Sequence, residues 1–318
     1  TGVQTCALPI SEHLDLGQLS NINATAVDFV NGLSSPEWVS LACTATTDNA
    51  VSKRDDRWQW KVSYLNDLPG CYFNNGTGTT NANVSGPHTI YNLLATPEPP
   101  WDTGSVNPLN PWASALDFVC TNAFSELGVA SEAEAMADIT AYLHSGHGLT
   151  YDINGGRPKY ASSDLGGTMD ITGYMAKSST LWGTAGNVVN CYDQASAVCT
   201  LGRLLGIAVE YCFMRPFGYI NTVDLVGEGP CNNPFYPLTT SNLKIADGDA
   251  VGRVRAAFAN HAFARHGGFV FDACAGPQTG SQSEAGYIAL VVDTSTPAEA
   301  AVAGTAANIT GGDVTVVR

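Results

Sequence analysis

The stretch AAFANHAFARHGGFVFDACA, Ala256 to Ala275, predicts a β-hairpin that brings two functional side chains together. Two apolar runs flank a turn at Arg265-His266-Gly267-Gly268, a composition typical of hairpins. If the turn is centred between His266 and Gly267, His261 lies directly opposite Asp272. Their side chains then share one face of the sheet, with Cβ atoms roughly 5 Å apart.

A histidine locked against a carboxylate is a unit of acid–base chemistry. The carboxylate accepts a hydrogen bond from one ring nitrogen, fixes the tautomer and favours the imidazolium. A turn of odd length would place His261 and Asp272 on opposite faces, so this prediction depends on the turn.

A second stretch, GNVVNCYDQASAV from Gly186 to Val198, places a cysteine where a helix is expected to begin. Asn190 is a good N-cap residue, and Cys191 follows as the first helical residue. A helix N-terminus and a nearby protonated histidine favour the thiolate, which is the reactive form of cysteine. Together with His261 and Asp272, the cysteine matches the pattern of nucleophilic acyl transfer. Taken in isolation, Cys191 would instead read as a small buried hydrophobe.

The pieces NCYDQASAV, NHAF and GGFVFDACAG, in this order, resemble the core of the transglutaminase-like superfamily of papain-type cysteine enzymes. GLTYD, at residues 148–152, fits the approach to that core, and the resemblance covers about residues 110–280. It implies an α+β papain-like transglutaminase core, with helices packed on an antiparallel sheet. It also implies Cys191, His261 and Asp272 as catalytic residues, and no cofactor or metal.

The family's usual glycine or tryptophan beside the cysteine is absent, because Asn190 precedes Cys191 and Tyr192 follows it. No oxyanion side chain is matched by the resemblance. Trp182 and Gln194 are weaker choices than the backbone N–H of Cys191.

The resemblance implies that Cys191 attacks a peptide or side-chain amide carbonyl to form a thioester, which water then hydrolyses. A peptidase or amidase with a protein or peptide substrate is therefore the first expectation. A cross-linking transglutaminase is the alternative within the enzyme class, and a glycan-releasing amidase is a weaker one. A non-catalytic surface-binding or structural module with a degenerate core is the alternative from a different class.

Helix signals surround this core. Asn110 and Pro111 predict the start of one helix and Gly128 its end. Ser131 and Glu134 form a capping-box pattern that predicts a second helix, running to about His144. The His144–His147 spacing lacks the partner motif of a metal site, so we read it as a helix end.

The chain is expected to hold two domains. Residues 1–10 resemble a translated sequencing adapter of the kind found in assembled environmental reads, and are excluded from fold reasoning. Residues 11–105 read as a mostly-β N-terminal domain, and 106–318 as the catalytic domain with C-terminal strands. The remaining predictions are strands at Arg57–Leu65, His88–Leu94, Ile207–Met214, Tyr287–Asp293 and Asp313–Val317, an exposed loop at Asn74–Gly86, an extended segment at Thr96–Trp112 and a small helix after Pro297.

The composition narrows the partners. The 318 residues carry 14 Lys and Arg against 29 Asp and Glu, a formal charge of −15, so no basic surface for nucleic acid is expected. No apolar run approaches membrane-spanning length. The Cys, Asn and Thr usage suits a secreted or cell-surface protein with some disulfides. Plausible bridges are Cys43–Cys71 and Cys231–Cys274, whereas Cys199 and Cys212 fit inert buried thiols.

Overall fold

The computed structural model describes residues 50–64, 78–102, 112–124, 129–153, 156–178, 186–232, 257–294 and 303–318, together with six short strands before residue 44. The chain divides into two compact units. The first comprises Thr1–Asn49 and Lys53–Asn92, and the second comprises Ala50–Ser52 and Leu93–Arg318.

The boundary after Asn92 lies earlier than the boundary after residue 105 that the sequence suggested. The backbone N–H of Ala95 donates to the carbonyl of Leu205, and that of Glu98 donates to Arg203. The indole N–H of Trp101 donates to the Thr200 carbonyl at 2.9 Å. Residues 95–101 are therefore fixed to a helix of the second unit.

Every described residue of the first unit lies in a strand. The predicted strand at Arg57–Leu65 falls largely within β7, and that at His88–Leu94 largely within β8. The predicted loop at Asn74–Gly86 is wrong from residue 78 onward, because β8 already begins there; its Thr and Val residues suit a strand. The strands are β1 Gln4–Cys6, β2 Pro9–His13, β3 Ile22–Ala24, β4 Val27–Val30, β5 Leu33–Ser34, β6 Leu41–Cys43, β7 Ser52–Tyr64 and β8 Gly78–Asn92.

The second unit is a mixture of helices and strands built on a seven-stranded sheet of order β10-β11-β20-β13-β16-β17-β19. Its neighbouring strands are antiparallel except for the parallel pair β11 and β20. The strands are β10 Ala161–Ser163, β11 Gly166–Met169, β13 Glu210–Met214, β16 His261–His266, β17 Phe269–Asp272, β19 Gln278–Ser283 and β20 Ile309–Val317. Smaller sheets contain β9 Thr150–Tyr151, β12 Val188–Val189, β14 Val223–Leu225, β15 Gly229–Cys231 and β18 Ala275–Gly276.

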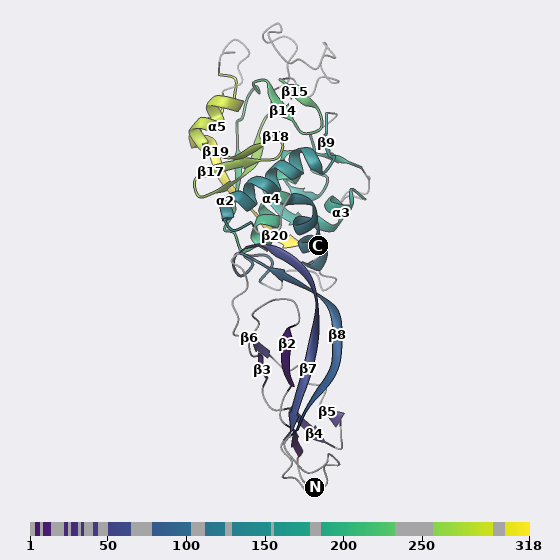
Figure 1. Cartoon of the computed structure of the whole chain (residues 1–318). Helices are drawn as coiled ribbons and strands as arrows, with labels where there is room; N and C mark the ends of the chain where they lie inside the picture. Colours follow the sequence, from purple (N-terminus) through teal and green to yellow (C-terminus); the bar gives the residue numbers. More distant parts are fainter. Residues whose placement is uncertain are drawn as a thin grey trace. The chain divides into compact units, whose positions relative to one another are not determined.

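Helices pack on this sheet. The helix α4, Cys191–Leu204, contacts β16, β11 and β13, and α2, Glu132–Ala141, lies between α4 and β19 (Figure 1). The other helical segments are α1 Trp112–Phe118, η1 Val119–Ala123, η2 Tyr142–Gly146, α3 Ile171–Ala176, α5 Glu284–Val291 and η5 Ala306–Asn308. Within the described ranges, none of the helices has the length and apolar character that a membrane crossing requires.

The helix predictions are largely confirmed. Ser131 caps α2, and its side chain accepts a hydrogen bond from the Glu134 N–H. The first helix ends sooner than expected, because Phe124 is already extended. Its expected start at Asn110 and end at Gly128 lie outside the described residues, as does the small helix expected after Pro297.

The hairpin forms with a register two residues away from the predicted one. His266 pairs with Phe269, so the turn consists of Gly267 and Gly268. Both glycines have positive φ, 58° and 84°, as a two-residue hairpin turn of the primed type requires. Side chains alternate with a period of two, so a two-residue shift leaves His261 and Asp272 on one face, now as diagonal neighbours.

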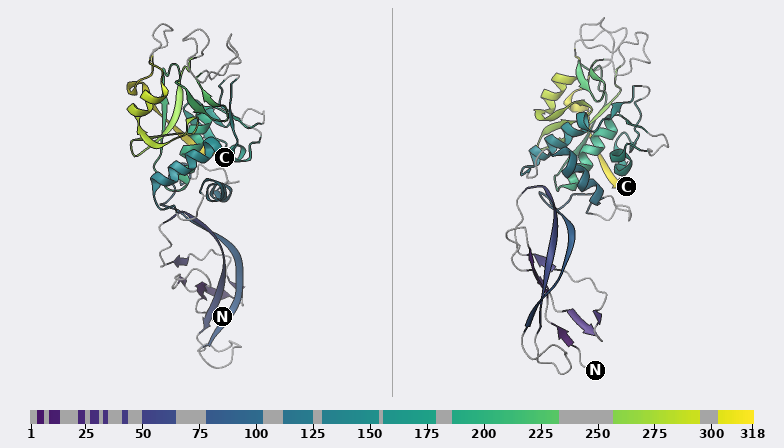
Figure 2. Two further views of the ribbon diagram at one scale, coloured as in Figure 1. Left: turned by 45° about the horizontal axis from the view of Figure 1, so that its top comes forward. Right: turned by 45° about the vertical axis from the view of Figure 1, so that its right-hand side comes forward.

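The predicted strand at Tyr287–Asp293 is wrong, because most of this segment belongs to the helix α5. Ser283 caps the helix by accepting a hydrogen bond from the Gly286 N–H. Tyr287 and Val291 are buried whereas Ala289 and Leu290 are exposed, a helical spacing rather than a strand alternation. The helix α5 packs against β17 and β19 (Figure 2).

Candidate active site

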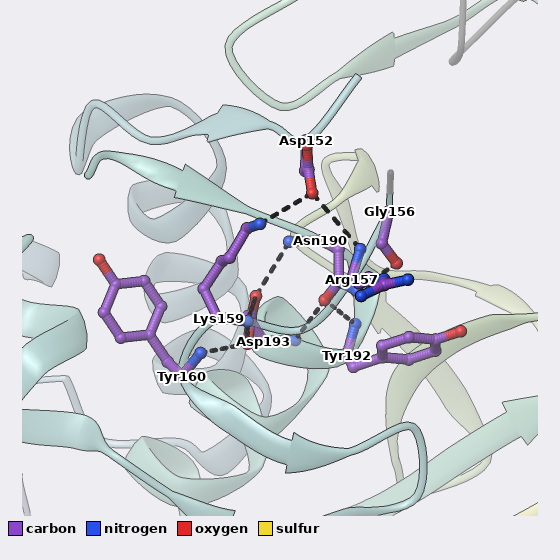
Figure 3. Close-up of polar contacts among 8 residues, drawn as sticks. All are labelled: Asp152, Gly156, Arg157, Lys159, Tyr160, Asn190, Tyr192 and Asp193. Carbon is purple, nitrogen blue, oxygen red and sulfur yellow. Dashed lines mark hydrogen bonds and ion pairs between the residues drawn. The ribbon is translucent and has the colours of Figure 1, made fainter. Parts of the chain in front are cut away.

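The start of α4 is built as the sequence predicted, with Asn190 as N-cap and Cys191 as the first helical residue. The Asn190 Oδ1 accepts the N–H groups of Tyr192 and Asp193 at 3.0 and 3.1 Å. The Asp193 carboxylate accepts the Asn190 N–H in return at 3.1 Å, which completes a capping box (Figure 3). This reciprocal cap fixes the backbone on both sides of Cys191.

Asp193 also ties the helix start to a neighbouring segment. Its carboxylate accepts the N–H groups of Lys159 and Tyr160 (Figure 3), and also that of Ala161, at 2.8–3.0 Å. Burial raises the pKa of Asp193 to about 6, although these backbone donors act in the opposite direction. Its hydrogen-bond donors among the described residues are all backbone groups, so Asp193 is a structural anchor at the start of α4.

The segment GLTYD contributes a strand beside the helix start. Strand β9 pairs in parallel with β12, so that Tyr151 lies in register with Val189, two residues before Cys191. The Asp152 N–H donates to the Val189 carbonyl at 2.7 Å. Since β12 leads directly into α4, this pairing holds the approach to Cys191 from a second side.

His261 and Asp272 form a buried pair. The ring Nε2 lies 2.8 Å from the Asp272 Oδ2, and the two residues are 0% and 1% exposed. Burial alone disfavours the charged ring, but the Asp272 carboxylate and the Cys191 thiol outweigh it and raise the pKa of His261 to about 10. The geometry therefore favours an imidazolium whose Nε2–H donates to Asp272.

The Asp272 carboxylate has a complete set of donors. Its Oδ2 also accepts the Tyr287 hydroxyl at 2.6 Å, while Oδ1 accepts the N–H groups of Cys274 and Ala275 at 2.7 and 3.1 Å. Burial opposes ionisation, but the charge of His261 and these hydrogen bonds hold the pKa of Asp272 below its ordinary value. The carboxylate is thus kept charged and fixed in orientation.

Cys191 interacts with the imidazole of His261. Since Nε2 is taken by Asp272, only Nδ1 remains to face the sulfur, and the Cys191 thiol is among the groups that raise the pKa of His261. Among the described residues, Nδ1 makes no hydrogen bond of ordinary geometry. A side-chain hydrogen bond with Cys191 nevertheless contributes to the raised pKa of His261, so the sulfur lies within reach of the ring in a contact of loose geometry. Apo cysteine sites often show such looser contacts.

An apolar box surrounds the imidazole. The Phe217 ring centroid lies 4.8 Å from that of His261, and the Phe258 centroid lies 5.8 Å away. Cys191 itself is only 3% exposed. Phe217 is fully buried against His261.

The Gln194 side chain is committed elsewhere and is excluded as an oxyanion donor. Its amide nitrogen donates to the carbonyls of Leu143 and Ala273 at 3.1 and 3.0 Å, and its oxygen accepts the Tyr174 hydroxyl. Trp182 lies outside the described residues. The Asn190 side chain binds the second and third N–H groups of α4. The first N–H group of the helix, that of Cys191, is not bound by this cap and is the donor that remains for an oxyanion.

The histidines of the HSGH segment make separate structural contacts. His144 Nδ1 lies 3.1 Å from the Ala273 carbonyl, and His147 Nε2 lies 3.0 Å from the Tyr174 carbonyl. The Ala273 carbonyl also accepts from Gln194, so this network fixes the chain directly after Asp272. In the described parts of the chain, no group of three or more His, Cys, Asp or Glu is placed to hold a metal ion.

The cysteines differ from part of the prediction. The six cysteines whose side chains the structure describes are all buried thiols, so the expected Cys231–Cys274 bridge is wrong. The expected Cys43–Cys71 bridge involves Cys71, which lies outside the described residues. Burial raises the pKa of Cys199 to about 12 and that of Cys212 to about 11, as suits inert core thiols.

A cavity of about 460 Å³ lies apart from these residues, along β13 and β20. Its two arginines are already neutralised: Arg203 pairs with Asp313 at 2.6 Å, and Arg265 pairs with Glu210 and Glu284. The lining includes none of the three predicted site residues, so this cavity does not define the reaction site.

A comparison of the chain with known protein families, curated proteins and solved structures finds no match.

Proposed function

We propose that the protein is a cysteine-dependent acyl-transfer enzyme of the transglutaminase-like, papain-type class, which cleaves peptide or side-chain amide bonds. The observation that carries the proposal is the orientation of the His261 ring, which directs each of its two nitrogens to a different partner. Its Nε2 is bound to Asp272 at 2.8 Å, and its Nδ1 is left to exchange a proton with Cys191 at the start of a helix. A helix on a mostly antiparallel sheet is compatible with this class of fold.

The proposed reaction has two steps, acylation of Cys191 and deacylation by water. In acylation, the Cys191 thiolate attacks the amide carbonyl, a carbon–sulfur bond forms, and the carbonyl oxygen becomes negative next to the Cys191 N–H. The His261 Nδ1 proton passes to the amide nitrogen, the carbon–nitrogen bond breaks, and the amine leaves. In deacylation, His261 takes a proton from water, the resulting hydroxide oxygen bonds to the thioester carbon, and the carbon–sulfur bond breaks.

A site-resolved thiol-labelling experiment tests this proposal. Cys191 should react with iodoacetamide faster than Cys199 and Cys212, which serve as buried thiols within the same molecule. The Cys191 rate should fall at least tenfold in His261→Ala. Equal labelling of Cys191 in both proteins would contradict the proposed pair.

A peptide library then separates hydrolysis from cross-linking. New N-termini that depend on Cys191 indicate hydrolysis, whereas incorporation of a labelled amine into a glutamine donor indicates a transglutaminase. In both cases Cys191→Ala should abolish the product.

The burial of the site supports one alternative, a structural or binding module with a degenerate core. Cys191 is 3% exposed and His261 is 0% exposed, so substrate must gain access through a local opening. If Cys191 is labelled only at urea concentrations above the unfolding midpoint of the protein, the structural or binding module is favoured over the enzyme.

A further inference from the structure

The helix α5, which the sequence did not predict, contributes a side chain to the His261–Asp272 pair. Tyr287 is fully buried, and its hydroxyl donates to the Asp272 Oδ2 at 2.6 Å. The same oxygen lies 2.8 Å from the His261 Nε2. The tyrosine ring packs on Phe263 with a centroid distance of 5.0 Å, and α5 lies beside β17 (Figure 2). A third element of the fold thus reaches the His–Asp pair.

The position of this hydroxyl decides how freely the carboxylate turns. The two backbone N–H groups bind only Oδ1 of Asp272, so they do not fix the position of Oδ2. The Tyr287 hydroxyl holds Oδ2 from the side of α5. Tyr287 belongs to α5 and His261 to β16, so the hydroxyl constrains Oδ2 independently of the imidazole.

We propose that Tyr287 is a positioning residue of the active site, which keeps the Asp272 Oδ2 directed at the His261 Nε2 and so keeps Nδ1 directed at Cys191. The role assigned to Nδ1 rests on the proposed acyl-transfer function, whereas the effect on Asp272 does not.

The electrostatic direction agrees with this role. The groups that face Asp272 are the imidazole of His261, the Tyr287 hydroxyl and the backbone beside Cys274. The electrostatic neighbours of Tyr287 also include Cys274, between β17 and β18, and Cys191, at the start of α4. Burial and the Asp272 charge raise the pKa of Tyr287 well above its ordinary value, so the hydroxyl remains a donor across the whole working pH range.

Tyr287→Phe removes the hydroxyl and leaves the packed ring, so it is the test variant. Carbon-13 NMR of the Asp272 carboxyl carbon, assigned by its loss in D272N, should show an acid midpoint about one pH unit higher than in the wild type. Solvent exchange of the His261 Nε2–H at pH 7 should accelerate about tenfold, because its acceptor is less well held.

Tyr211→Phe is the matched control, since it also removes one hydroxyl hydrogen bond of a buried tyrosine, here to the Asp164 carbonyl at 2.8 Å. It should leave both measurements at their wild-type values. The proposal is overturned if Tyr287→Phe changes neither measurement, or if Tyr211→Phe changes them equally.

Failure of the proposed function gives a different result. In that case Cys191 is inert to iodoacetamide in every variant, while the Asp272 midpoint still reports on Tyr287. If the site is active, Tyr287→Phe should also slow Cys191 labelling at pH 7 several-fold, and a Tyr211→Phe protein should label at the wild-type rate.

Discussion

The charge of the imidazole is the most direct test of the site, and Asp272→Asn is the perturbation that addresses it. The difference between a His261 pKa of about 10 and the ordinary 6.5 corresponds to roughly 5 kcal/mol in favour of the charged ring. The Asp272 carboxylate is the leading favourable contribution. Without its charge, burial dominates, and we expect His261 to be neutral at pH 7.

The hydrogen bonds make this substitution more severe than a loss of charge. All four partners of Asp272 are donors: the His261 Nε2–H, the Tyr287 hydroxyl and two backbone N–H groups. If the NH₂ group of D272N takes the place of Oδ1, it faces two backbone N–H donors. If it takes the place of Oδ2, it can donate to a neutral Nε2, but the Tyr287 hydroxyl loses its carboxylate acceptor. A buried mismatch costs about 1–3 kcal/mol, so the variant should also lose at least about 1–3 kcal/mol of unfolding free energy.

Nitrogen-15 NMR of the histidine rings measures the outcome. The wild type should show an imidazolium for His261 at pH 8, assigned by its absence in His261→Gln, and D272N should show a neutral ring. Asp313→Asn is the control, since it removes a half-exposed carboxylate paired with Arg203 and should leave the His261 signals unchanged. A His261 that stays cationic at pH 8 in D272N would refute the electrostatic account.

Three further measurements test the surrounding structure. Folding raises the pKa of His261 from 6.5 to about 10. The contribution of the charged ring to stability is therefore complete below pH 6.5 and is lost as the pH rises to 10. The unfolding free energy measured in urea should decline across this range in the wild type and not in His261→Gln. Asn190→Ala removes the acceptor for two N–H groups and should lower the unfolding free energy by about 1 kcal/mol in the same assay. Gly268→Ala has nothing within 4 Å of the added Cβ, so its expected cost of about 1–2 kcal/mol arises from φ of 84° alone, and an unchanged melting temperature would contradict that.

The part of the site that the sequence predicted correctly is the part governed by local rules. Asn190 as a cap and Cys191 as the first helical residue follow from side-chain hydrogen bonding at helix starts, which depends on a few neighbouring residues. His261 and Asp272 share a sheet face because of a period of two. That is why a turn misplaced by one residue, and a register shifted by two, still gave the correct pair.

The errors arise where tertiary contacts decide between local alternatives. The segment Tyr287–Asp293 is apolar and β-branched enough for a strand, yet the Ser283 cap and burial at Tyr287 and Val291 make most of it a helix. The signal was present as a serine followed by Glu284, a first-turn acidic residue. The contact of Phe217 with His261 is likewise tertiary, because the two residues lie 44 positions apart in the sequence.

These side chains depend on one another in order, because burying each charged group costs free energy that the next group in the network offsets. The box of Phe217 and Phe258 excludes water, so a charged His261 is stable there only because Asp272 is charged. A buried carboxylate is stable only when donors satisfy it, and one of its four is Tyr287 from a separate helix. Tyr287, which is linked to the Cys191 sulfur through Asp272 and His261, should therefore affect the reactivity of the Cys191 thiol. The contacts of Cys191 and His261 alone do not predict this effect.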